Sequence, residues 1–202
     1  MAQKAFRWII PVVIIVVLIL MAYSSFKGTY NKMVQLEESV KASWGQVENV
    51  YQRRMDLIPN LVATVKGYAA HESDTLSAVT EARSKVGGVM NISDEVLKDP
   101  AAFQRFQQAQ GELSGALQRL MVVTENYPDL KANQNFLALQ DQLEGTENRI
   151  TVERMRFNEE AQGYNTYIKQ FPRLFIANMS GFDEIFYFKA TEGADTAPTV
   201  TF

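Results

Sequence analysis

The chain has 202 residues, a formal net charge of −3 from 20 basic and 23 acidic residues, and no cysteine. The lack of cysteine excludes disulfides and thiolate chemistry, and with a single histidine any metal site would depend on carboxylates. The slightly acidic balance lacks the positive excess that neutralises phosphates, so we expect no nucleic-acid partner.

An uncharged apolar run opens the chain, from Trp8 to Tyr23. With its flanks the run reaches about 20 residues, enough for one helix across about 30 Å of hydrocarbon. Trp8 and Tyr23 lie where interfacial aromatic residues anchor a span. We therefore expect residues 1–26 to be a retained transmembrane anchor. The alternative is a signal peptide cleaved near Ala22-Tyr23-Ser24, but its apolar core would be unusually long.

Apolar residues at spacings of three and four continue from Leu36 to Val86, which is typical of an amphipathic helix. Their phase survives Pro59 and so predicts one kinked, continuous helix of about 60 residues, or on the order of 90 Å. A break into two helices at Ile58 is the alternative. We expect Gly87-Gly88 to end this helix.

Two further helices are predicted. Asp99 and Pro100 supply an N-cap and a first-turn proline for the first, which stops near residues 126–129. The second runs from about Leu130 to Lys169, after which the helical pattern ends.

The predicted fold is all-α. The anchor of residues 1–26 precedes a domain of residues 27–190, an antiparallel bundle of three to four long helices. A short aromatic stretch leads into a tail, residues 191–202, that we expect to be extended or flexible unless a partner pairs with it.

Two dense blocks of sequence stand out in the first and third long helices. They are Tyr51-Gln52-Arg53-Arg54-Met55-Asp56-Leu57-Ile58-Pro59-Asn60-Leu61 and L139-Q-D-Q-L-E-G-T-E-N-R-I150. These blocks resemble the LemA family, and the similarity covers about Asn31 to Phe188. The resemblance implies one amino-terminal span and a helical-bundle domain in the bacterial envelope. It also implies associations with membrane-protease neighbours or membrane biogenesis, and names no reaction.

Basic residues lie on both sides of the expected span, with Lys4 and Arg7 before it and Lys27 after it. The positive-inside rule leans towards an amino terminus in the cytoplasm and an exported body. We expect a single-pass protein of a bacterial membrane, the inner membrane where there are two.

Charged residues interrupt the apolar stripes of the first and third long helices. Glu147 and Arg154 fall at the stripe's own spacing, so we expect them to point into the bundle or a subunit seam. We interpret the cluster as an ion-pair network that fixes helix register, with a partner-docking face or a substrate pocket as alternatives. Its members are Arg53, Arg54, Asp56, Asn60, Glu144, Glu147, Arg149 and Arg154.

Catalytic motifs are absent from the sequence. His71-Glu72 would need a second histidine four positions after the first to bind zinc, and Thr75 stands there. No phosphate-binding loop or nucleophile elbow occurs either. We expect no catalytic residue, no cofactor and no metal.

The aromatic end leaves two interpretations open. Its residues either pack over the open end of the bundle or contact a membrane surface or another subunit. The last residues, 199–202, are candidates for adding a strand to a neighbour or entering a groove. The aromatic residues are Phe171, Phe175, Phe182, Phe186, Tyr187 and Phe188.

Three functions fit these features. The leading hypothesis is a non-enzymatic, membrane-anchored scaffold that forms a homo-oligomer through its long amphipathic helix and organises partners or membrane. The alternative is an adaptor or regulator of another membrane machine, such as a membrane protease. An enzyme that uses the polar cluster is the third.

Overall fold

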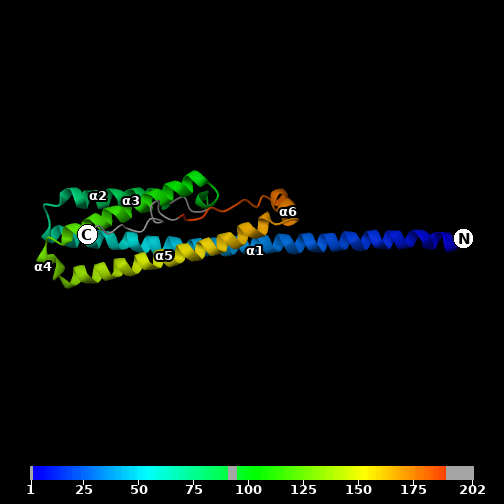
Figure 1. Ribbon diagram of the computed structural model, residues 1–202, viewed down its shortest axis with the longest axis horizontal. Coiled ribbons are helices and arrows are strands. Elements are labelled where there is room, and N and C mark those ends of the chain that lie inside the picture. Colours follow the sequence, from blue (N-terminus) through cyan, green and yellow to red (C-terminus); the bar gives the residue numbers. More distant parts are fainter. Residues whose placement is uncertain (1, 91–94, 190–202) are drawn as a thin grey trace, which may run out of the picture. The chain divides into compact units, whose positions relative to one another are not determined.

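The computed structural model describes residues 2–90 and 95–189, and every regular element within them is helical (Figure 1). The expected all-α fold with one long apolar amino-terminal helix is confirmed. The described chain separates into a first unit, residues 2–41 and 160–184, and a second unit, residues 42–90, 95–159 and 185–189. The elements are α1 (Ala2–Tyr68), α2 (Ser73–Met90), the 3₁₀ helix η1 (Glu95–Leu97), α3 (Pro100–Thr124), α4 (Pro128–Lys131), α5 (Gln134–Lys169) and α6 (Arg173–Ser180).

Helix α1 continues through Pro59 and does not break at Ile58. Proline has no amide hydrogen, so Pro59 leaves the carbonyl of Met55, one turn earlier, without its usual donor. Arg83 of α2 supplies that donor, because its Nε lies 3.1 Å from the Met55 oxygen. A side chain from the neighbouring helix therefore satisfies the acceptor that the proline frees, which helps α1 to tolerate a proline in its interior.

The prediction of one helix as far as Val86 is wrong, because the chain turns at residues 69–72 between α1 and α2. Ala69, the first residue of the turn, and Leu76, in the first turn of α2, are both buried. The apolar spacing therefore continues across the reversal and does not reveal it. Gly87-Gly88 lies inside α2 and does not end it.

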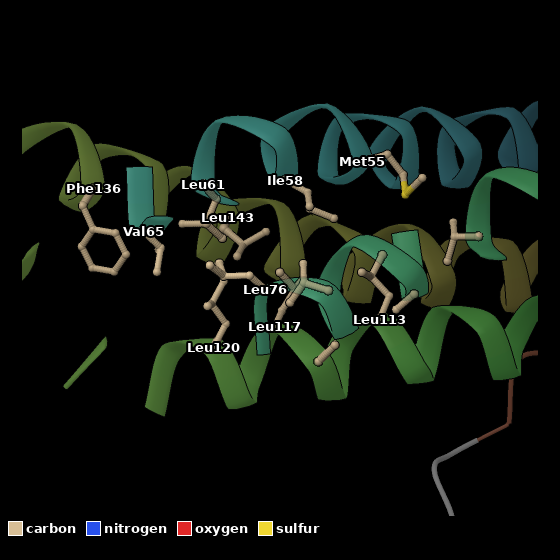
Figure 2. Packing of buried hydrophobic residues seen from close by; sticks show 14 of the residues in the cluster. Met55, Ile58, Leu61, Val65, Leu76, Leu113, Leu117, Leu120, Phe136 and Leu143 are labelled. Atoms are coloured by element: carbon tan, nitrogen blue, oxygen red, sulfur yellow. The ribbon is translucent and has the colours of Figure 1, made fainter. Parts of the chain in front are cut away.

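Helices α1 to α5 contribute to one hydrophobic core in the second unit (Figure 2). Helix α5 runs against α1 in the opposite direction. Asn133, just before α5, donates to the Tyr68 hydroxyl at 2.8 Å, and Gln142, further along, lies 3.5 Å from an Arg53 nitrogen. The core includes Met55, Ile58, Leu61, Val65, Leu76, Val79, Val86, Leu113, Leu117, Leu120, Leu130, Phe136 and Leu143.

Two polar side chains fix where helices begin. The carboxylate of Asp99 accepts a hydrogen bond from the amide of Ala101 at 2.8 Å, and Pro100 is the first residue of α3, so this predicted start is confirmed. Asn133 accepts from two amides in the first turn of α5, at 2.9 and 3.1 Å. The helix predicted from about Leu130 therefore starts after this cap, and the short helix α4 precedes it.

The first unit combines the amino-terminal part of α1 with the end of α5 and with α6. The ring of Tyr30 packs edge-on against Phe182, with centroids 5.5 Å apart, and the Tyr164 hydroxyl donates to the carbonyl of Asp183 at 3.0 Å. The sequence did not predict α6, because two helical turns are too short for periodicity to show. The expected tail, residues 191–202, lies outside the described residues.

Candidate functional site

The polar cluster of the second unit is centred on Arg54, whose side chain is 1% exposed. Its Nη1 donates to Glu147 Oε1 at 2.8 Å and to Ser114 Oγ at 2.9 Å, and its Nη2 donates to Gln110 Oε1. The guanidinium carbon also lies 5.1 Å from the centre of the Tyr51 ring. Helices α1, α3 and α5 therefore meet at one buried cation, called here the Arg54 centre.

The two charges of this centre differ in their contact with water. Arg54 is withdrawn from solvent, whereas the Glu147 side chain is 40% exposed. The Nε of Arg54 has no protein partner among the described residues. A buried ion pair of this kind contributes little net stability, but losing one partner leaves the other charge uncompensated. The pair therefore favours the helix arrangement that keeps both charges together.

Arg154 of α5 joins the Arg54 centre through Tyr51. Burial raises the pKa of the Tyr51 hydroxyl, and the positive charges of Arg154 and Arg54 oppose that rise. Arg154 also lies 4.5 Å from the centre of the Phe188 ring and donates to the carbonyl of Lys189 at 3.3 Å. This one side chain thus links the helical core to the extended segment that follows α6.

Aromatic rings enclose that extended segment. Trp44 packs against Phe106, Phe157 and Phe188 with ring centroids 5.2, 5.3 and 6.0 Å apart. The Asn158 side chain donates to the Phe188 carbonyl and accepts from the Phe188 amide, each at 2.9 Å. Phe188, one of the aromatic residues whose role the sequence left open, is therefore a core residue of the second unit.

The remaining members of the predicted cluster lie apart from the Arg54 centre. Arg53 is exposed and approaches Gln142, and the exposed Asp56 accepts from Gln52 on its own helix at 2.7 Å. The side chains of Asn60, Glu144 and Arg149 are also exposed. Of the eight predicted residues, the structure brings together Arg54, Glu147 and Arg154.

Sequence reasoning missed Gln110, Ser114 and Asn158. Gln110 lies at helical spacing between Phe106 and Leu113, so its polarity within an apolar stripe was the available signal. Ser114 and Asn158 carry no such signal, because a small polar residue beside a stripe is equally typical of a helix's exposed side.

The Arg54 centre is a network of charge-assisted hydrogen bonds. Arginine stays protonated and cannot accept a proton from Ser114. No group of three or more His, Asp or Glu side chains within residues 2–90 and 95–189 is placed to hold a metal ion. His71 lies exposed in the turn between α1 and α2. The arrangement can hold three helices in register.

Helix α1 also carries a segment long and apolar enough, by length and composition, to cross a membrane. Its large apolar side chains from Ile10 to Met21 are 41% to 63% exposed. Tyr23 is exposed as well, and for Trp8 the structure describes only the helical backbone. An apolar surface on all sides of a helix is typical of a membrane span.

Comparison with known proteins identifies a family and several relatives. The LemA family profile matches residues 43–202, which include every residue of the Arg54 centre. Magnetosome protein MamQ of Magnetospirillum gryphiswaldense is 29% identical over 187 residues, 85% of this chain and 68% of the relative. Magnetosome protein MamQ 2 of Paramagnetospirillum magneticum is 28% identical, over 95% of this chain and 77% of the relative. Protein LemA of Metamycoplasma hominis is 22% identical, over 84% of this chain and 73% of the relative. Because the profile covers most of the sequence, the chain belongs to the LemA family.

Proposed function

We propose that this protein is a non-enzymatic, membrane-anchored scaffold of the bacterial envelope, with its span in the inner membrane and its body exported. The observation that carries the proposal is that α1 has an exposed apolar segment near its start and buried core residues further along. Its side chains from Ile10 to Met21 are apolar and exposed, whereas Val47, Ile58 and Val65 further along are buried core residues. One helix would therefore be both the lipid-facing anchor and a central helix of the body, with no linker between them.

The relatives and the polar cluster support this proposal. Two relatives are named as magnetosome proteins, which is consistent with a role at a membrane surface. The Arg54 centre supports a non-enzymatic role, because its cation is occupied by Glu147, Gln110 and Ser114. In this proposal the antiparallel helices form a body that holds other molecules near the bilayer.

Self-association belongs to the proposal, but the apolar stripe of α1 offers it little surface. Val40, Val47 and Val65 of that stripe are 0% exposed, so contacts within the chain already cover them. A second copy would instead meet the exposed residues of the span or the charged outer surface of the body.

Alkaline extraction of membranes from cells that express the full chain tests the anchor. The wild type should stay with the membrane, and the variant Ile14→Arg/Leu18→Arg should be released. Each arginine near the centre of a span costs about 2.5–3.5 kcal/mol on insertion. The matched control is Val122→Arg, which changes an exposed apolar residue of α3 and should stay membrane-bound. Release of the wild type would contradict the proposal.

Cross-linking tests the scaffold. The sequence has no cysteine, so Leu20→Cys introduces a single thiol in the exposed surface of the span. Oxidation in native membranes should link two copies, and Val122→Cys on α3 should give less cross-linking. A particle that is monomeric by mass and carries no other protein would refute the scaffold, and a stoichiometric second protein would favour the adaptor.

A further inference from the structure

We propose that α6 lies in the membrane interface, with one apolar face buried among lipid headgroups and the adjoining ends of the acyl chains. The inference rests on the proposed function, because it requires α1 to span a bilayer. The exposed aromatic residues near α6 would then contact a lipid surface, either zwitterionic or mixed in composition.

Helix α6 exposes a row of large apolar side chains. Phe175 is 66% and Met179 71% exposed, and a spacing of four residues places them on one side of the helix. Phe171, just before the helix, is 82% exposed, and its ring contacts Phe175 edge-on with centroids 5.8 Å apart. Ala177 is buried, so the helix has a covered side and an uncovered one. Clustered apolar exposure marks a contact surface, and an amphipathic helix of this kind is typical of a membrane interface.

The end of α6 is fixed against the amino-terminal part of α1, within the first unit (Figure 1). Gly181, with φ 74°, caps α6, and the next residue, Phe182, packs against Tyr30 of α1 at 5.5 Å. Tyr30 lies seven residues beyond Tyr23, or about 10 Å along the helix axis. The headgroup layer extends roughly 5–7 Å beyond the hydrocarbon on each side. Tyr30 therefore lies just outside that layer, and Phe182 packs on it, so the length of α6, about 12 Å, is enough to cover the remaining distance.

The charged side chains that flank and begin α6 already have contacts within the chain. Lys169 pairs with Glu184 at 2.5 Å, and the guanidinium of Arg173 lies 4.1 Å from the centre of the Tyr167 ring. Burial of apolar area would therefore drive the contact, so it should form on phosphatidylcholine and change little with salt.

Site-directed nitroxide labels on the full chain in phosphatidylcholine nanodiscs test the inference. Three single-cysteine variants are compared: Phe175→Cys on α6, Val122→Cys as an exposed aqueous control, and Leu18→Cys within the span. Collision rates with oxygen, which concentrates in lipid, and with a water-soluble nickel chelate report the surroundings of each label. The oxygen-to-nickel ratio at Phe175→Cys should be severalfold above that at Val122→Cys and should persist in high salt.

The other outcomes overturn the inference in distinguishable ways. A ratio at Phe175→Cys equal to that at Val122→Cys would show that α6 faces water. Low collision rates with both reagents would show that a second copy or another protein covers it. If Leu18→Cys reports lipid in either case, only the placement of α6 fails. If Leu18→Cys itself reports water, the anchor and the proposed function fail together.

Discussion

Replacing Glu147 with alanine should destabilise the second unit by about 2 kcal/mol. Arg54 is 1% exposed, and Glu147 is its anionic partner at 2.8 Å. A hydrogen bond to a charged group contributes about 1.5–3 kcal/mol, and breaking a fully buried ion pair costs about 3–5 kcal/mol. Glu147 is 40% exposed, so water can approach the vacated position and the loss falls in the lower part of these ranges.

Urea unfolding of the detergent-solubilised full chain, followed by Trp44 fluorescence, measures this loss. Trp44 lies among the aromatic rings of the second unit, and Trp8→Phe in every variant removes the other tryptophan signal. The matched control is Glu144→Ala, an exposed glutamate on the same helix, which should change the free energy of unfolding by less than about 0.5 kcal/mol.

A double variant separates the charge effect from lost packing. Arg54→Met removes the cation that Glu147→Ala leaves uncompensated, so the two changes together should cost less than the sum of the single losses. Equal losses for Glu147→Ala and Glu144→Ala, or strictly additive losses in the double variant, would refute the argument that Arg54 requires its counterion.

Three further changes test other contacts by urea unfolding. Arg83→Ala should cost about 1 kcal/mol by leaving the Met55 carbonyl without a donor, and far less in a Pro59→Ala background, where the new amide can donate. Additive losses would contradict this. Asp99→Ala should cost about 1 kcal/mol through the lost N-cap, and an unchanged urea midpoint would count against it. Burial raises the pKa of Tyr164 above its unfolded value of about 10, so the folded chain keeps a proton that the unfolded chain releases. Stability should be insensitive to this group below about pH 9 and fall as pH rises through 10. Because Tyr164 lies in the first unit and Trp44 in the second, unfolding is followed here by far-ultraviolet circular dichroism. Tyr164→Phe should flatten that fall, and an identical slope in this variant would rule out Tyr164 as its source.

The helices were predictable where apolar spacing and caps agree. Asp99 and Pro100 gave the start of α3 correctly, and the continuation of α1 through Pro59 followed from the phase of the stripe. The turn at residues 69–72 was not predictable from that phase, because the buried positions on its two sides keep helical spacing. Pairing between helices, such as Arg83 with the carbonyl freed by Pro59, depends on tertiary contact and leaves no local signal.

The candidate site was predictable in part: the apolar spacing singled out Glu147 and Arg154 as inward-pointing, but it did not distinguish Arg54 from Arg53. Arg53 and Arg54 are adjacent in sequence, yet Arg53 is exposed and Arg54 is 1% exposed, because neighbours on a helix differ by about 100° around its axis. On α5 the apolar spacing favoured Glu147 over Glu144, and Glu147 reaches Arg54 while Glu144 is exposed. The partners of Arg54 on α3, Gln110 and Ser114, depend on how that helix packs against α1, which the residue pattern does not give.

Because Phe182 packs on Tyr30, the length of the helical stretch from Tyr23 to Tyr30 sets the distance between the apolar run and the end of α6. Every residue removed there would draw the docking point of α6 about 1.5 Å closer to the end of the apolar run and swing it about 100° around the axis. A single deletion would thus change both the distance of the exposed apolar side chains of α6 from the membrane and the side of α1 on which they lie. Substitutions that keep the helix would change neither. The number of residues in this stretch should therefore constrain the protein more tightly than their chemical identity.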